Sequence, residues 1–437
     1  MKFFSKTLKH LNFDFRSVKS GSTVLFNKLL GILLGYLIIL YISRTYGPAT
    51  VGVYTICYTI LQIMGNLGRC GTDVYMLQKV SYLYPARDCK LTKYFKKSTQ
   101  ITVIVSLVLT IVLISNSPWV AETFLDSSYT YAVLAVAIGI LPMAMINING
   151  AVLHGMENFS KFSFSTNTSI FLFSGIFLLI SSAITTKDWI VFYSLSFGVV
   201  FTLMLGYLWV KNGFKELNQS QKNATISESW LKVLAQSYPM MLTASIMFLV
   251  NWTDSLMLGI LKDTESVGLY SVASRIASVL ILIPYSINAV VAPKFAKDYS
   301  NGIVKVKILK NVKNMSFLTT LGLVIPIFLI GRNILTLFGE EFSNSYYCLI
   351  ILAIGILISN YFSLAEYVLQ MSNNQDILWK CILLGLILNI FFNYLLIPSY
   401  GIEGAAVASA LSIICWNIIA YLFAMKKINP LIKLNPQ

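Results

Sequence analysis

Long apolar stretches separated by short polar segments dominate the chain. Each stretch is about 20 residues or longer, which is the length that an α-helix needs to cross the hydrocarbon core of a bilayer. The pattern predicts an all-α polytopic membrane protein with twelve transmembrane helices. The predicted spans are residues 22–43, 50–72, 100–116, 131–153, 163–184, 189–210, 233–260, 267–292, 315–338, 345–370, 377–398 and 402–424.

Two segments recur at a constant offset along the chain. Val51-Gly52-Val53-Tyr54 returns as Val267-Gly268-Leu269-Tyr270, and Leu153–Asn158 aligns with Leu369–Asn374. Because the offset is about half the chain length, we expect one membrane unit that was duplicated and fused, as in many carriers. The predicted domains are a six-helix bundle at residues 1–215 and a second six-helix bundle at residues 216–437.

Composition and charge agree with a membrane location. Hydrophobic residues make up 56% of the chain and charged residues 12%, and the net charge is +15. With the N-terminus in the cytoplasm, most Lys and Arg fall in the inner loops and the two termini, while Asp and Glu divide almost evenly. This asymmetry is typical of a multi-pass protein with both termini in the cytoplasm, and it argues against a nucleic-acid partner.

Catalytic and metal-binding patterns are missing from the sequence. The two histidines, His10 and His154, are too few for a metal site, and there is no glycine-rich phosphate loop. The six cysteines form no CxxC pair, so we expect no disulfide and no metal. The chain is therefore not expected to be an enzyme or to need a cofactor, although a proton or sodium ion is a candidate for coupling.

Charged residues inside the predicted helices are the first candidates for a site. They are Lys28, Arg69, Asp73, Asp254, Arg275 and Glu366. Each would cost about 3 kcal/mol at the bilayer centre, so we expect them to face a protein-lined or watery interior. The three bases suit an anionic headgroup such as a diphosphate. Two alternatives stay open: Lys28 extends to the interface, or Arg69 and Asp73 only neutralise each other.

The three acids, Asp73, Asp254 and Glu366, are coupling or gating candidates. Asp254 and Arg275 lie at similar depths on adjacent predicted helices, where they form either a structural pair or a gate. Glu366 has no evident partner on its own helix, which makes it the acid most expected to titrate.

Amides and aromatic rings within the spans suggest a polyhydroxylated cargo. The candidates for sugar contact are Asn147, Asn251, Tyr285, Asn288, Asn360, Tyr361 and Asn389. Buried amides need hydrogen-bond partners, which either a glycan or neighbouring helices supply.

Several motifs, taken in order along the chain, resemble one known family. They are Tyr46-Gly47-Pro48, Leu67–Asp73, Asp254–Gly259, Val267–Tyr270, Pro284, Pro293 and Asn393–Ala406. The family is that of the Wzx-type flippases of polysaccharide repeat units, in the polysaccharide transporter branch of the multidrug, oligosaccharidyl-lipid and polysaccharide exporter superfamily.

The resemblance implies a MATE-like exporter fold, with two six-helix bundles around a central cavity and alternating access. The implied cargo is an undecaprenyl-diphosphate-linked oligosaccharide, such as an O-antigen (lipopolysaccharide) or capsular repeat unit. It would move from the inner to the outer leaflet of a bacterial cytoplasmic (inner) membrane. Lys28, Arg69 and Arg275 would line the cationic cavity. Membrane lipids and the polymerase and chain-length regulator of the same pathway are the implied partners.

Four alternative functions can be distinguished from the sequence. An ion-coupled multidrug exporter of the same fold would place a carboxylate in spans 1, 4, 5 or 6, which contain none. A lipid II exporter commonly has two further helices. A polysaccharide polymerase would need a large outer loop or a catalytic pair there, and a scaffold protein would not need intramembrane charges.

Overall fold

The computed structural model describes residues 15–215, 217, 230–300, 306–372 and 374–434, and the regular structure in them is helical. The long elements are α2 (Phe15–Arg69), α4 (Lys90–Ser115), α6 (Thr130–Gly155), α8 (Ser169–Ser182), α9 (Trp189–Phe214), α10 (Trp230–Leu261), α11 (Thr264–Ser300), α12 (Val306–Thr336), α13 (Tyr346–Phe362) and α15 (Gln375–Leu434). Shorter elements are α3 (Thr72–Leu83), α5 (Ser117–Phe124), η1 (Ser127–Tyr129), α7 (Phe159–Ser163), the π-helical η2 (Phe164–Thr168), η4 (Glu340–Ser345) and α14 (Leu364–Met371). The all-α prediction is confirmed.

The described helices also account for the twelve predicted spans. Nine of them are long and apolar enough to cross a membrane, and α10 adds the shorter apolar segment Phe248–Leu261. Two of the nine, α2 and α15, each contain two spans, because Gly47 (φ 81°) and Gly401 (φ 55°) interrupt their helical backbone. A positive φ is readily adopted by glycine alone, so these two residues mark the turns between consecutive spans.

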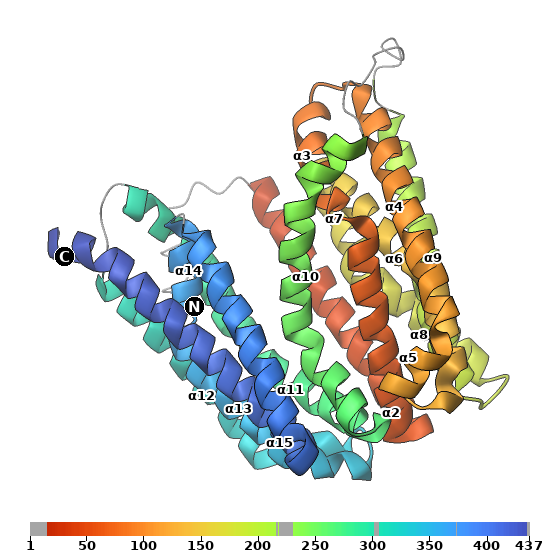
Figure 1. The fold of residues 1–437 in the computed structure, drawn as a ribbon. Helices are drawn as coiled ribbons and strands as arrows, with labels where there is room; N and C mark the ends of the chain where they lie inside the picture. The colour runs from red at the N-terminus through yellow and green to blue at the C-terminus, as the bar shows by residue number, and fades with distance from the viewer. Residues whose placement is uncertain (1–14, 216, 218–229, 301–305, 373, 435–437) are drawn as a thin grey trace. The chain divides into compact units, whose positions relative to one another are not determined.

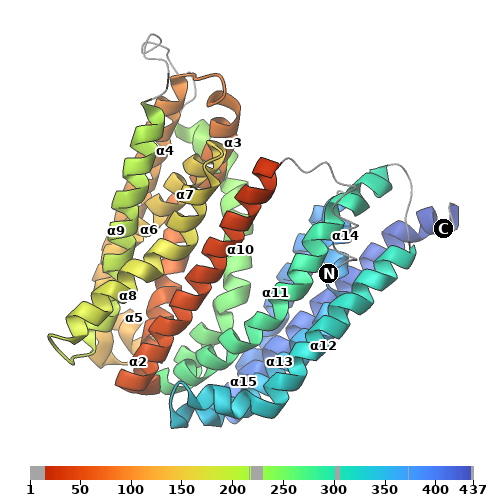
Figure 2. The same cartoon turned by 180° about the vertical axis from the view of Figure 1, so that it is seen from behind.

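The chain packs as two compact units (Figures 1 and 2). Unit 1 comprises Met1–Ile38, Ile60–Ser117 and Tyr131–Leu242, and unit 2 comprises Ile39–Thr59, Pro118–Thr130 and Thr243–Gln437, each within its described residues. Two segments of the first sequence half therefore pack with the second half. The predicted division at residue 215 concerns the duplicated sequence and stays a prediction.

In unit 1, α8 packs along α9, and α2 meets the π-helical segment at very short range. A Cβ built on Gly31 would lie 2.1 Å from the carbonyl oxygen of Asn167. Next to this contact, Asn27 Nδ2 donates to Ser163 Oγ at 2.7 Å and the Thr168 hydroxyl donates to the Asn27 carbonyl at 2.8 Å. Small residues and interhelical hydrogen bonds stabilise helix pairs in membranes in this way.

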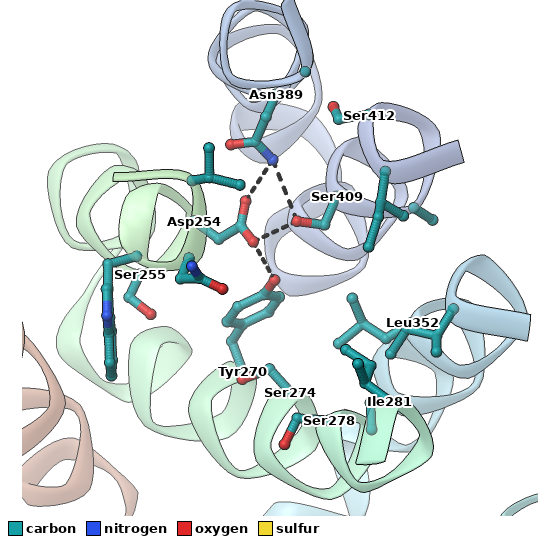
Figure 3. Close-up of a pocket in the computed structure, with 18 of the residues that line it drawn as sticks. Asp254, Ser255, Tyr270, Ser274, Ser278, Ile281, Leu352, Asn389, Ser409 and Ser412 are labelled. Atoms are coloured by element: carbon teal, nitrogen blue, oxygen red, sulfur yellow. Dashed lines mark hydrogen bonds between the residues drawn. The ribbon is translucent and has the colours of Figure 1, made fainter. Parts of the chain in front are cut away.

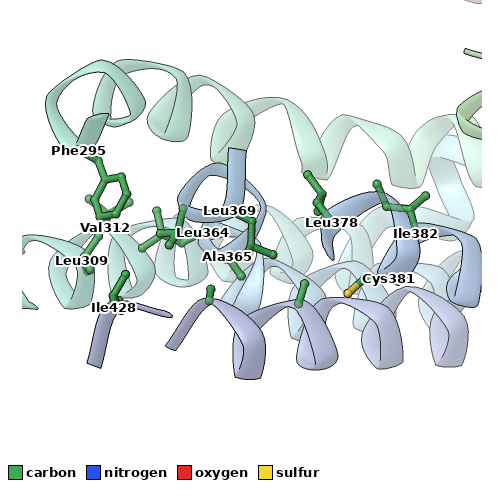
Figure 4. Packing of buried hydrophobic residues seen from close by; sticks show 13 residues of the cluster. Phe295, Leu309, Val312, Leu364, Ala365, Leu369, Leu378, Cys381, Ile382 and Ile428 are labelled. Carbon is green, nitrogen blue, oxygen red and sulfur yellow. The ribbon is translucent and has the colours of Figure 1, made fainter. Parts of the chain in front are cut away.

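In unit 2, a buried apolar cluster joins α11, α12, α14 and α15 (Figure 4). Phe295 and Leu309 lie at one end of the cluster and Leu378 and Ile382 at the other, with Leu369 of α14 fully buried between them. Because lipid tails are as apolar as these side chains, the stabilisation comes from close packing rather than from removal of water. The cluster holds α14 and α15 in place beside the polar cavity described next.

The duplicated sequence motif meets its own copy within unit 2. A Cβ built on Gly52 would lie 1.7 Å from the carbonyl oxygen of Thr264, and a Cβ built on Gly268 would lie 2.0 Å from that of Pro48. Gly52 corresponds to Gly268 in the repeat, and Pro48 corresponds to Thr264. The contact is therefore reciprocal, as at an interface around a twofold axis.

Candidate functional site

Unit 2 contains a partly open cavity of about 600 Å³. Its wall is formed mainly by α10, α11, α13, α14 and α15, with Thr55 of α2 added. The lining residues include Asn251, Trp252, Asp254, Arg275, Glu366, Asn389 and Trp416, together with several serines. Ligand cavities in proteins are commonly of this size and combine apolar walls with a few polar groups.

Asp254 of α10 is the centre of the polar wall, and four side chains donate hydrogen bonds to it. Figure 3 shows those from Tyr270, Asn389 and Ser409. Oδ1 accepts from Asn389 Nδ2 at 2.9 Å and from Asn393 Nδ2 at 2.8 Å. Oδ2 accepts from the Tyr270 hydroxyl at 2.5 Å and from the Ser409 hydroxyl. The carboxylate is buried, with Asp254 only 8% exposed, so these donors replace the water that an ionised group requires.

The kink of α15 explains why its two limbs contribute to one cluster. Asn389 and Asn393 are one turn apart on the limb before Gly401, and Ser409 lies on the limb after it. Asn389 Nδ2 also donates to Ser409 Oγ at 3.2 Å, which joins the two limbs directly. The turn at Gly401 therefore brings residues of two consecutive spans to the same carboxylate.

Glu366 and Arg275 lie in the wall of the same cavity, and both are half-buried. Gln370 Nε2 donates to Glu366 Oε1 at 3.3 Å from one turn further along α14. The expectation that Glu366 lacks a partner on its own helix is therefore wrong, because an amide four residues away is within reach of the carboxylate.

Trp416 forms an aromatic part of the wall and depends on a glycine for its position. A Cβ built on Gly385 would lie 2.7 Å from Trp416 Cδ1 and 3.0 Å from its Cγ. The indole therefore lies directly against the backbone of the first limb of α15. Trp252 stands elsewhere in the wall, with its ring centroid 5.7 Å from that of Tyr58.

The charged candidates of the first half lie in unit 1. Arg69 Nη1 and Asp73 Oδ2 form an ion pair at 2.8 Å, and Arg69 also donates to Asn66 Oδ1. The neutralising pair foreseen for Arg69 and Asp73 is thus present. Lys28 is exposed on α2, next to Asn27.

The sugar-contact candidates divide into two groups. Asn251 and Asn389 line the cavity of unit 2. Asn147 donates to the Met143 carbonyl of its own helix at 3.0 Å, and Asn360 donates to the Thr320 hydroxyl at 3.1 Å. The ring of Tyr361 lies 3.9 Å from Lys313 Nζ. These three bond within the protein, and the side chains of Tyr285 and Asn288 lie outside the described residues.

Three members of the Asp254 cluster, Tyr270, Asn393 and Ser409, were not among the predicted site residues. The repeat offers a signal that would have found Asn393 and Ser409 but not Tyr270, whose counterpart at the same offset is Tyr54. At the same offset, Asp254, Asn389, Asn393 and Ser409 correspond to Ile38, Phe173, Phe177 and Tyr193, so the polar set occurs in one half of the sequence only. A polar set with no counterpart in the duplicate is not needed for the common fold, which favours a role in function.

The Asp254 cluster is built from oxygen-bearing side chains. It has one carboxylate and otherwise neutral oxygen-bearing groups, and oxygen ligands are preferred by hard cations. Among the residues that the structure describes, no three His, Cys, Asp or Glu side chains come together as a metal site.

Together, the fold and the site define a helical membrane protein whose described residues form a cavity with a buried carboxylate cluster in its wall. Comparison with known families assigns the class. The chain belongs to the family described as "Polysaccharide biosynthesis protein", which matches residues 17–298, and the MatE family matches residues 239–395. Both resemblances agree with the exporter superfamily expected from the sequence motifs.

Curated relatives of this chain include two probable flippases of an archaeon. A probable low-salt glycan biosynthesis flippase, Agl15 of Haloferax volcanii, is 30% identical over 243 residues, which are 54% of this chain and 49% of that protein. The chain thus spans about half the length of that relative. A probable flippase of the same organism, AglR, is 24% identical over 406 residues, which are 88% of this chain and 79% of the relative. The chain is homologous to membrane flippases.

Solved structures confirm the MATE-like exporter fold. An inward-facing multidrug resistance MATE family transporter gives a TM-score of 0.76 at 13% identity, covering 94% of this chain and 99% of that one. The lipid II flippase MurJ in an inward closed conformation gives 0.70 at 16% identity, covering 94% and 87%.

Proposed function

We propose that the chain is a flippase that moves a lipid-linked oligosaccharide across the membrane by alternating access. In the specific form of this proposal, the cargo is an undecaprenyl-diphosphate-linked repeat unit of an O-antigen or capsule. It moves from the inner to the outer leaflet of a bacterial cytoplasmic membrane. The observation that carries the proposal is the polar cavity built around Asp254 within a unit of membrane-spanning helices. A hydrophobic drug would not require such a dense set of hydrogen-bonding groups.

The cavity of unit 2 suits the sugar part of the cargo better than the diphosphate. Arg275 shares its wall with two carboxylates, those of Asp254 and Glu366, so acidic groups outnumber basic ones there. Two phosphates would be repelled by these carboxylates. The hydroxyl and amide groups of a sugar can instead hydrogen-bond to acids and amides, and the sugar ring can contact an aromatic face. We therefore propose that the cavity receives sugar rings, with Trp416 as one contact face. Lys28 and Arg69 remain the proposed partners of the diphosphate.

Coupling is proposed at the Asp254 cluster. Four donors saturate the carboxylate in this state, so an entering cation would have to displace some of them or turn the two amides so that their oxygens face it. Either change would alter the contacts between α10, α11 and α15. Binding of one proton or sodium ion at this cluster would thereby favour one conformation of the carrier over another.

The experiment is headgroup translocation in liposomes that contain the purified protein. A fluorescent polyprenyl-diphosphate oligosaccharide is incorporated, and an impermeant quencher reports the fraction of headgroups in the outer leaflet. We expect protein-dependent movement that is weakened in Arg275→Ala and in Trp416→Ala, since both residues line the cavity, while Trp379→Ala, which changes an exposed tryptophan, transports normally. Ion-dependent efflux of a cationic dye without glycan movement would place the chain among the multidrug exporters instead.

A further inference from the structure

The reciprocal glycine contact between the two copies of the repeated motif is not used by the binding site or by the coupling site. Gly52 lies in the part of α2 that follows the Gly47 kink, and Gly268 lies in the first turns of α11. Both are buried, and each meets a backbone carbonyl of the other segment. Because a backbone carbonyl is not a movable side-chain end, glycine is required at both positions for this approach.

Two further contacts secure the same region of unit 2. Arg44 Nε donates to the Leu337 carbonyl at 2.6 Å, and its Nη2 donates to the Thr336 carbonyl at 3.5 Å. These are the carbonyls at the C-terminal end of α12, where a cation is favoured by the helix dipole. In addition, a Cβ on Gly259 would lie 2.6 Å from the Phe124 carbonyl, so α10 and α5 also pack backbone to backbone.

All of these contacts tie a segment of the first sequence half to helices of the second half. Gly47, Arg44, Phe124 and Thr264 lie at or next to the connections between spans that the charge pattern assigns to the outside. The closest approaches between these segments are those of glycine positions to main-chain carbonyls of the facing segment.

We propose that the Gly52–Gly268 contact, secured by Arg44 on the end of α12, is a latch that closes the outer exit of the carrier. The latch must part for cargo to leave on that side. The proposal rests on the flippase function, and it adds the particular backbone contact whose separation defines the outward-open state. The reciprocal arrangement has a simple origin, since duplicated segments can meet around a pseudo-twofold axis.

The test is the accessibility of a buried cysteine placed beside the latch, and it needs no cargo. Val267→Cys is introduced into a chain whose six native cysteines are replaced, since Val267 is 0% exposed. A bulky maleimide then reports opening in detergent-purified protein. A second reporter, Val152→Cys, is 0% exposed in the core of unit 1 and detects unfolding instead.

We expect Gly52→Ala and Gly268→Ala each to raise labelling at Val267→Cys by about tenfold, because overpacking on this scale shifts equilibria by at least such a factor. Val152→Cys should stay protected. The matched control is Gly322→Ala, a helical glycine whose Cβ would meet nothing within 4 Å, and it should leave both reporters unchanged. Labelling of Val267→Cys equal to that of the control would overturn the latch.

If the alanine variants unfold, both reporters become exposed and the test needs a variant that keeps both glycines. Arg44→Gln keeps a side chain of similar length but removes the charge at the end of α12. It should increase labelling of Val267→Cys alone, and no increase would also overturn the latch. If Val267→Cys responds as expected but no glycan moves in liposomes, the flippase proposal fails while the latch stands.

Discussion

Replacement of Asp254 by asparagine tests whether the carboxylate cluster organises unit 2. Each carboxylate oxygen accepts two hydrogen bonds in the structure. In Asp254→Asn one oxygen becomes an NH₂ group. Two of the four donors then lose their acceptor, although hydroxyl groups can rotate to accept from the new amide. A buried donor without an acceptor costs about 1–3 kcal/mol, so we expect a loss of about 1–3 kcal/mol in total.

The assay is thermal unfolding of the detergent-purified protein. For domains of the size of unit 2, each kcal/mol of lost stability lowers the midpoint temperature of unfolding by about 2–4 °C. Asp254→Leu should unfold at a still lower temperature, because all four donors lose their acceptor. Glu122→Gln, which changes an exposed acid of α5, is the control. If Asp254→Asn unfolds at the same temperature as this control, the four hydrogen bonds contribute nothing measurable to unit 2.

Three further predictions concern sodium binding, the ion pair of unit 1 and the glycine contacts. If sodium binds at the Asp254 cluster, replacing choline by sodium should raise the unfolding midpoint of the wild type but not that of Asp254→Asn, since a ligand that binds only the native state stabilises it. An equal rise in both proteins would place the ion elsewhere. Arg69→Ala should lower stability by about 1–3 kcal/mol, because Asp73 keeps its charge without its partner, and the second change Asp73→Asn should recover part of the loss. Gly385→Ala should displace Trp416 and reduce glycan movement about as much as Trp416→Ala, whereas Gly322→Ala should cost no activity and add about 0.5–1 kcal/mol of stability.

The helices could be predicted from the sequence, but most hydrogen-bond partners of the polar residues could not. Apolar stretches of spanning length identify helices because a chain that crosses the bilayer must satisfy its backbone hydrogen bonds internally. The two glycine kinks lie in short links that the predicted span boundaries already marked. Arg69 and Asp73 could be paired because they lie four residues apart on one helix. The partners of Asp254 lie more than 130 residues away in the case of Asn389 and Asn393, where helical spacing gives no information. The hydrogen bond from Asn360 to Thr320 of α12 likewise joins residues that helical spacing does not connect.

The difference between the duplicated halves leads to a last prediction. Ile38 stands at the repeat position of Asp254, and it packs near Gly175 of α8, with its Cγ1 3.6 Å from a Cβ built there. On the same helix, Phe173 and Phe177 stand where the second half has its two asparagines, and they pack against Phe201 and Phe197 of α9. The helix α8 therefore carries aromatic rings at the positions where the second half has amide donors.

Ile38→Asp would place a carboxylate in this apolar setting without the four donors that Asp254 has. We expect it to destabilise the protein by more than Asp254→Asn does, because an unpaired buried charge costs several kcal/mol or must take up a proton. Ile38→Asn and Ile38→Val are the graded controls, and thermal unfolding is again the measurement. If Ile38→Asp is as stable as Ile38→Val, the first half can accept a charge as readily as the second. The argument that one half alone is built for a coupling ion would then be lost.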